Sequence, residues 1–326
     1  MNRRKVLLGM VALPLTTLAN GQQKLPLVAI LSPVSRNAGL VNIPFKEALV
    51  RLGYEPGRTI ELAERFADGD ESRLPALAAE LVALQPAVLF TNTSGAAAVA
   101  ARATRTIPIV VGPAGEFVLR ELAGGSLARP TTNVTGFVLT SPDIDNKSIA
   151  LLVETVPAAR RIGVLVNPSN PAMKEYPAPQ NAALRGSGVT FVRLEASGPT
   201  DIDAALVKAS AQRLDALFVP DDSHLAAHPT LTARVLRFAS AARIPVASSH
   251  QNYARAGALL AMGPSIPALA ARAAGYVVKI LEGARPADLP IELPSVLTTV
   301  VNLRTAKVLG ITVPKAVLLR ADELIE

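Results

Sequence analysis

The chain has 326 residues, of which 50% are hydrophobic and 18% are charged, a composition that supports about two folded domains and argues against disorder. Its formal net charge is +7, and it contains three histidines, no tryptophan and no cysteine. These counts exclude disulfides, thiol nucleophiles, cysteine-bound metal sites and cysteine-linked lipid anchors, so we expect a protein that is not a lipoprotein.

The N-terminus has the pattern of a signal peptide. Two arginines and a lysine at 3–5 precede an apolar run at 6–19, which is shorter than the about 20 residues that span a bilayer. A buried first helix is the alternative, but Pro14 counts against it. The paired arginines also resemble a twin-arginine signal, and the sequence leaves the export route and the cleavage site open. We expect a periplasmic protein whose charge, after removal of residues 1–21, falls to +4 without any basic cluster for nucleic acid.

From residue 25 onward, short apolar runs typical of buried strands alternate with stretches typical of helices. The expected strands are 27–31, 59–67, 87–91, 107–112, 133–139, 160–167, 189–195, 215–220, 244–249, 257–263 and 298–303. The expected helices are 43–52, 72–84, the alanine-rich helix that Ser94 opens, 143–156, 171–186, 200–213, 225–242, 266–282 and 304–310. A spacing of roughly 25 residues per strand–helix pair predicts right-handed crossovers and parallel sheets.

The two halves of the chain resemble each other. Three pairs of segments match: VAILSP with VLVNP, VLFTNTS with LFVPDDS, and IPIVVG with IPVASS. The repetition predicts an α/β protein with two doubly wound parallel-sheet lobes. Because the carboxyl ends of both sheets would face one cleft, we expect a ligand there.

The usual sequence motifs of enzymes and cofactor sites are missing. There is no G-x-G-x-x-G after the first strand, no Walker-type phosphate loop and no G-x-S-x-G nucleophile elbow. His224 and His228 share a helix face and could bind a metal, but no glutamate lies between them, and a capped helix start explains them equally well. We expect no enzyme, no cofactor and no metal.

Polar residues directly after apolar strands are the candidate ligand contacts. Such residues cap helices in any α/β protein, or they line the cleft between the lobes. Ser94 opens a helix, where free N–H groups favour a carboxylate. Asp221 or Asp222 could face an ammonium group, and the combination suits a zwitterion such as an amino acid. The candidate set is Ser32, Thr93, Ser94, Gly112, Asn167, Asp221, Asp222 and Gln251.

Several long segments resemble the periplasmic substrate-binding proteins of ABC transporters of the tryptophan/tyrosine-binding type. They are RLPALAAELVALQPAVLFTNTSGAAAVAARATRTIPIVV, SLARPTTNVTGF, VLVNPSNP, KILEGARPADLPIELP and VNLRTAKVLGITVPKAVLLRADELIE. The resemblance implies the type 1 periplasmic-binding fold and a monomeric solute receptor, which closes by a hinge around a small ligand and delivers it to an inner-membrane permease.

In that fold the chain crosses between the lobes three times, which is expected here near 137–139, 262–265 and 293–297. The implied parts are a signal peptide at 1–21, an N-terminal lobe of 22–137 plus 264–294, and a C-terminal lobe of 138–263 plus 295–326.

The sequence departs from this family at three pairs of residues. Many relatives carry Asp-Pro where this chain has Glu116-Phe117, and Gly-Gly where it has Thr131-Thr132. Many also carry Ser-Tyr where it has Ala261-Met262. The last change removes an aromatic residue near the cleft, and aromatic residues are only 4% of the chain. We therefore expect a ligand other than tryptophan or tyrosine. Tyr176 and Tyr253 are the remaining candidate cleft aromatics, and packing as ordinary surface tyrosines is the equal alternative for both. Two other functions stay open: a ligand sensor that docks on a membrane receptor, and an exported α/β hydrolase.

Overall fold

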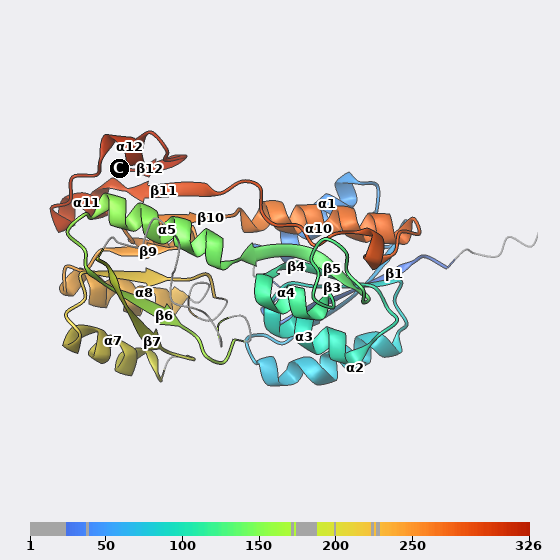
Figure 1. The fold of residues 1–326 in the computed structure, drawn as a ribbon. Helices are drawn as coiled ribbons and strands as arrows, with labels where there is room; N and C mark the ends of the chain where they lie inside the picture. Colours follow the sequence, from blue (N-terminus) through green and yellow to red (C-terminus); the bar gives the residue numbers. More distant parts are fainter. Residues whose placement is uncertain are drawn as a thin grey trace, which may run out of the picture.

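The computed structural model describes residues 24–36, 39–170, 173, 188–198, 200–222, 225 and 229–326. Over these residues the chain forms two α/β lobes, each built on its own sheet (Figure 1). The predicted architecture of two lobes with parallel sheets is confirmed, with one antiparallel exception that is described below.

The first sheet has five parallel strands in the order β2-β1-β3-β4-β5. Ala29 and Leu31 of β1 pack on one face of the sheet, while Val28 and Ile30 pack on the other. Because both faces are buried, the strand is an unbroken apolar run in the sequence. The strands are β1 (Leu27–Ser32), β2 (Glu61–Phe66), β3 (Val88–Thr91), β4 (Ile109–Gly115) and β5 (Val134–Thr140).

Helices cover both faces of this sheet. One face carries α1 (Asn42–Arg51) and α10 (Ile266–Leu281), which lie side by side in Figure 1 although they come from opposite ends of the chain. The ring of Phe45 in α1 stacks on that of Phe90 in β3, with centroids 3.7 Å apart. The other face carries α2 (Leu74–Ala83), preceded by the short 3-10 helix η1 (Glu71–Arg73), then α3 (Ser94–Ala103) and α4 (Glu116–Leu122).

The second sheet has the strand order β12-β11-β10-β9-β8-β6-β7. All neighbours are parallel except β10 and β11. The sequence predicted parallel strands only. Because β10 leads out of this lobe and β11 returns to it beside β10, β11 runs in the opposite direction. The strands are β6 (Arg161–Val166), β7 (Thr190–Glu195), β8 (Ala216–Val219), β9 (Val246–Ser248), β10 (Leu260–Gly263), β11 (Thr298–Asn302) and β12 (Glu323–Ile325).

Helices also cover both faces of the second sheet. One face carries α5 (Pro142–Thr155), α11 (Leu303–Leu309) and α12 (Lys315–Leu318), and the other carries α7 (Ile202–Ala211) and α8 (Pro229–Ala241). The short α9 (Asn252–Ala256) follows β9. The expected helix at 171–186 lies outside the described residues, apart from residue 173. No helix in the described ranges is both long and apolar enough to cross a membrane.

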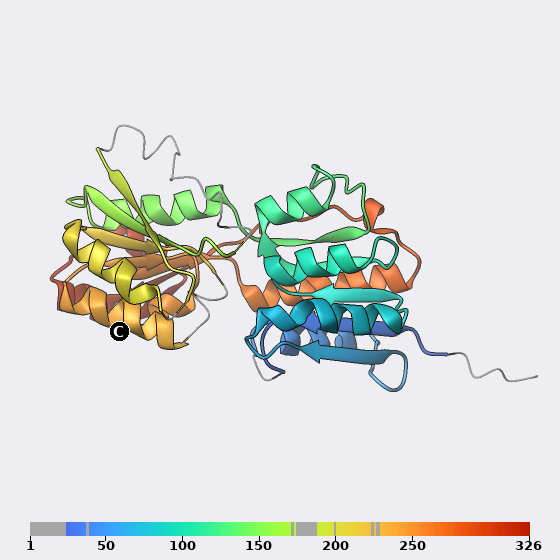
Figure 2. The same ribbon diagram turned by 90° about the horizontal axis from the view of Figure 1, so that it is seen from below.

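Three connections join the lobes through the narrow waist that Figure 2 shows. They lie between β5 and α5, between β10 and α10, and between the 3-10 helix η2 (Pro286–Asp288) and β11. The third connection lies along β5: the Val138 N–H donates to the Glu292 carbonyl at 2.8 Å, and the Glu292 N–H donates to the Gly136 carbonyl at 3.0 Å. The division into lobes at the expected residues stays a prediction, and β5 belongs to the first sheet as far as Thr140.

Asn302 ties the end of β11 to α9 and α11. Its Nδ2 donates to the Ala254 carbonyl at 2.9 Å, and its Oδ1 accepts from the Thr305 N–H at 2.9 Å. We expect Asn302→Ala to lower the free energy of unfolding by about 2–3 kcal/mol, because the buried carbonyl and the helix N–H lose their partners. Denaturant unfolding measures the loss. Lys307→Ala, an exposed change in the same helix, should stay within about 0.5 kcal/mol of the unchanged protein; equal effects of the two substitutions would contradict this role of Asn302.

Candidate functional site

A cavity of about 460 Å³ lies between the two lobes. Both sheets contribute the segments that follow the carboxyl ends of their strands, as expected for doubly wound sheets. The first lobe supplies Val34, Gly39, Leu40, Val41, Asn92, Thr93, Ser94, Pro113, Ala114 and Gly115. The end of β5 supplies Leu139 and Thr140, the start of α10 supplies Ile266, and the second lobe supplies Asn170, Asp221, His250 and Asn252.

The N-terminus of α3 forms part of the first-lobe wall. The Thr93 hydroxyl accepts a hydrogen bond from the Ala96 N–H at 3.2 Å and so caps the helix. The hydroxyl of Ser94 accepts from the Gly115 N–H at 3.0 Å, which holds the helix start against the end of β4. The N–H groups of Ser94 and Gly95 stand in the first turn, where a helix has no acceptor of its own. The turn favours a carboxylate, and the Glu71 carboxylate lies beside it, since a Cβ at Gly95 would be 3.0 Å from Glu71 Oε2.

A buried network behind the same wall positions Asn92. Its Nδ2 donates to the Ser32 hydroxyl at 3.1 Å and to Asn42 Oδ1 at 3.0 Å, while Asn42 Nδ2 donates to Ser32 at 3.3 Å. Ser32 is fully buried and holds Asn92 in place instead of lining the cavity. Asn92 itself lines the cavity, and its buried Oδ1 has no partner among the described residues.

The second-lobe wall contains Asp221. Burial, and after it the neighbouring Asp222, raise the pKa of Asp221 to about 8, well above the ordinary value of 3.8. Among the described residues, its one hydrogen bond runs from the backbone N–H to the Ser249 hydroxyl at 2.8 Å. A cation in the cavity would stabilise the ionised carboxylate, so this side chain can bind an ammonium group.

Asp222 and Asn167 support the turn after β8. The Asp222 carboxylate accepts from Asn170 Nδ2 at 2.6 Å, from the Leu225 N–H at 2.9 Å, and from Asn167 Nδ2 at 3.4 Å. Neither Asp222 nor Asn167 lines the cavity. Their hydrogen bonds fix the loop that carries Asp221 and Asn170.

Gly112 and Gln251 also stand beside the cavity. A Cβ at Gly112 would lie 3.0 Å from the ring of Phe90, so the glycine allows β3 and β4 to pack closely. Gln251 Nε2 donates to the Gly263 carbonyl at 3.2 Å. Gln251 lines an adjoining cavity of about 210 Å³, which shares Asp221 and His250 with the first.

The structure thus gathers part of the predicted set. Thr93, Ser94 and Asp221 line the main cavity and Gln251 the adjoining one, while Ser32, Gly112, Asn167 and Asp222 lie behind the walls. The candidate set leaves out Asn170 and Asn252. It also leaves out Asn92 and His250, although both follow strands as its other members do. It also left out the aliphatic lining, which carries no signal in the sequence: Val34, Leu40, Val41, Leu139 and Ile266.

The predicted role of Tyr253 as a cleft aromatic is wrong. The side chain is fully buried in the core beneath α8, and its hydroxyl donates to the Leu225 carbonyl at 3.1 Å. This burial raises its pKa. Tyr176 lies outside the described residues, and no phenylalanine or tyrosine is found among the described residues that line the cavity.

The predicted histidine pair cannot be located. His224 and His228 lie outside the described residues. Within the described ranges, no group of three or more His, Asp or Glu side chains is arranged to hold a metal ion.

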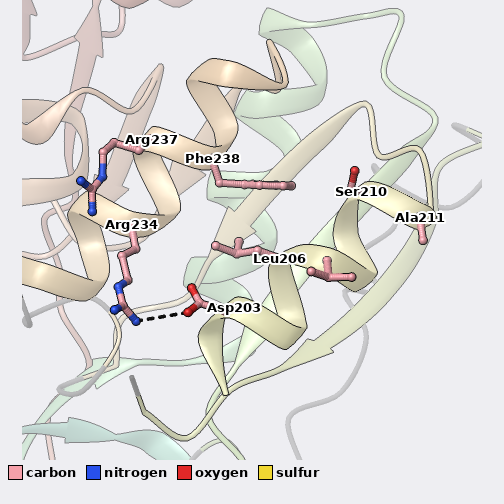
Figure 3. A pocket seen from close by; sticks show the side chains of 8 residues that line it. Asp203, Leu206, Ser210, Ala211, Arg234, Arg237 and Phe238 are labelled. Atoms are coloured by element: carbon pink, nitrogen blue, oxygen red, sulfur yellow. Dashed lines mark ion pairs between the residues drawn. The ribbon is translucent and has the colours of Figure 1, made fainter. Parts of the chain in front are cut away.

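A larger hollow of about 870 Å³ lies on the flank of the second lobe (Figure 3). All of its lining residues belong to α7 and α8. Arg234 faces Asp203 across it at 3.5 Å, and Asp203 is largely exposed. Because this groove is open to solvent and receives nothing from the first lobe, the cavity between the lobes is the better candidate site.

Comparison with known proteins gives a family. The profile of the family described as "ABC transporter substrate binding protein" matches residues 27–325. A "Tyrosine-binding protein" of Clostridioides difficile (strain R20291) is 25% identical over 266 residues, which cover 81% of this chain and 75% of that protein.

Solved structures are similar over almost the whole chain. A conserved domain protein of Vibrio cholerae is 28% identical, with a TM-score of 0.81 over 92% of this chain and 100% of that one. A domain from Streptococcus pneumoniae in complex with L-Trp is 23% identical, with a TM-score of 0.83 over 93% and 100%. A ligand-free, open substrate-binding protein of Clostridium difficile with adhesive properties is 24% identical, with a TM-score of 0.67 over 92% and 99%. The last two structures, at 23% and 24% identity, show a similarity of fold alone.

Proposed function

Since the chain belongs to the ABC transporter substrate-binding protein family, we propose that it binds a zwitterionic α-amino acid in the cavity between its lobes. In this proposal the protein is exported to the periplasm, acts there as a monomer without catalysis, and delivers the amino acid to an inner-membrane permease. The cationic and apolar N-terminus supports export.

One observation supports the choice of ligand: one wall of the cavity favours an anion and the other favours a cation. The first turn of α3, with Thr93 and Ser94, favours an anion on one side. The Asp221 carboxyl, which no described cation contacts, favours a cation on the other. An α-amino acid carries a carboxylate and an ammonium group on one carbon and satisfies both walls.

The lining also bears on the side chain of the amino acid. The remaining surface is largely aliphatic, with Leu40, Leu139 and Ile266 among its residues. The volume of about 460 Å³ lies within the range of small-molecule sites. We therefore propose an apolar amino acid. The relatives whose names state tyrosine or L-Trp support an amino acid, and the aliphatic lining favours an aliphatic side chain.

Thermal unfolding with each of the twenty common L-amino acids tests the proposal. We expect at least one apolar L-amino acid, at about 100 times its Kd, to add roughly 2.7 kcal/mol of stability, which shifts the melting temperature by several degrees. The D-enantiomer is the matched control. Melting temperatures that none of the twenty raises would refute the amino-acid assignment.

A further inference from the structure

His250 is held rigidly where β9 ends. Its backbone N–H donates to the Ser248 hydroxyl at 3.0 Å, and its carbonyl accepts from the Tyr253 N–H at 3.0 Å. The Asn252 N–H donates to the ring nitrogen Nδ1 at 3.2 Å. The residue is 3% exposed, and it lines both the main and the adjoining cavity.

These contacts define the protonation of the ring. Burial, together with the nearby charge of Arg255, lowers the pKa of His250 to about 4, so the imidazole is neutral at physiological pH. Since Nδ1 accepts a hydrogen bond, the one proton of the neutral ring stands on Nε2. The Nε2–H is therefore the hydrogen-bond donor of the neutral ring.

This donor has no partner among the residues that the structure describes. Among the described residues, Nε2 is buried and makes no hydrogen bond. A buried polar group without a partner costs about 1–3 kcal/mol, and a ligand atom that pairs with the group removes that cost. Asn92, which lines the opposite wall of the same cavity, also has a buried Oδ1 without a partner among the described residues.

We infer that His250 is a specificity-determining ligand contact whose Nε2–H donates to a carboxylate oxygen of the bound amino acid. The inference rests on the proposed function. An ammonium group only donates, and the aliphatic lining offers no match for a polar side chain, so the carboxylate is the acceptor that remains. The carboxylate is then held from both lobes, by the first turn of α3 and by His250.

Two substitutions distinguish a role of His250 in ligand binding from a role in the structure alone. His250→Asn places its amide near the position of Nδ1, so that it still accepts from the Asn252 N–H but has no donor at the position of Nε2. His250→Gln places its amide nitrogen near the position of Nε2 and restores that donor. Titration calorimetry would measure both variants and the unchanged protein with the twenty L-amino acids, and with the amine that lacks the carboxylate of the tightest of them.

We expect His250→Asn to weaken binding of the amino acid by roughly tenfold to a hundredfold, as for a lost hydrogen bond to a charged group. The affinity for the amine should not change, and His250→Gln should recover most of the loss. Equal losses for amino acid and amine would mean that His250 only supports the structure, and unchanged affinity in His250→Asn would overturn the inference outright. If the unchanged protein binds none of the twenty, the proposed function fails and the inference fails with it.

Discussion

Asp221→Asn should stabilise the protein and abolish its response to ligand. Burial and Asp222 raise the pKa of Asp221 to about 8, so the empty site tolerates the charged form poorly. The asparagine is never charged, and we expect it to add about 1–3 kcal/mol to the free energy of unfolding at pH 8.5. The same change removes the only carboxylate on the cavity wall among the described residues, so no amino acid should raise the melting temperature of the variant.

The pH dependence follows from the same pKa. Between about pH 4 and pH 8 the folded protein keeps a proton on Asp221 that the unfolded chain has released. The folded state therefore binds more protons, and this group makes the protein less stable as pH rises through that window. The stabilisation in Asp221→Asn should be absent near pH 4 and largest at pH 8 and above.

Ligand affinity should rise with pH, whereas the contribution of Asp221 to stability falls with pH. An ammonium group needs the ionised carboxylate, so affinity should rise by up to tenfold per pH unit below about pH 8 and level off above it. Denaturant melts and calorimetry across pH 5 to 9 measure both effects. Asp203→Asn, at an exposed carboxylate outside the cavity, is the control and should change neither. A destabilised Asp221→Asn, or one that still binds, would refute this account of the site.

Gly263→Ala should be strongly destabilising. A Cβ at Gly263 would lie 1.8 Å from the Ser249 carbonyl oxygen, a backbone atom that cannot move without displacing the loop of His250. We expect a loss of about 3 kcal/mol or more in the free energy of unfolding. Because this glycine ends β10 where the chain leaves for the first lobe, variant protein that still folds should also bind its amino acid more weakly.

Gly275→Ala is the matched control. Gly275 lies within α10, and a Cβ there would meet nothing within 4 Å. Alanine favours helix more than glycine does, so the control should gain about 0.5–1 kcal/mol. Denaturant unfolding of both variants measures the contrast. A Gly263→Ala variant that is as stable as the unchanged protein would disprove the close approach of Gly263 to the Ser249 carbonyl oxygen.

The strands were predictable because most are short apolar runs between breaker residues, as in Leu27–Ser32. The helices and the strand that sequence reasoning omitted are short: α4, α9, α12 and β12 have seven, five, four and three residues. Elements of these lengths contain too few turns or alternations for a hydrophobic period to appear in the sequence. The antiparallel β11 could not be foreseen, since an apolar run does not reveal its partner or its direction.

The polar part of the cavity lining was predictable to the extent that its residues follow strands. Thr93, Ser94 and Asp221 were found in this way. The same signal also selected Ser32 and Asn167, because a residue that faces the cavity and one that holds its neighbour look alike in a sequence. The prediction for Tyr253 was wrong for a related reason. Its hydroxyl donates to a backbone carbonyl in the core, and no local sequence pattern indicates such a contact.

The packing of α10 on α1 has a consequence for how the protein folds. The Tyr54 hydroxyl and the Glu282 carboxylate, which meet where these helices pack, are 228 residues apart in the chain. Until α10 has been synthesised, α1 alone covers the apolar face of the first sheet that holds Val28 and Ile30. Such distant contacts form slowly, and a partly uncovered sheet face promotes aggregation. A nascent chain that ends before residue 266 should therefore depend on chaperones, and the first lobe, although its strands come early, should be completed late.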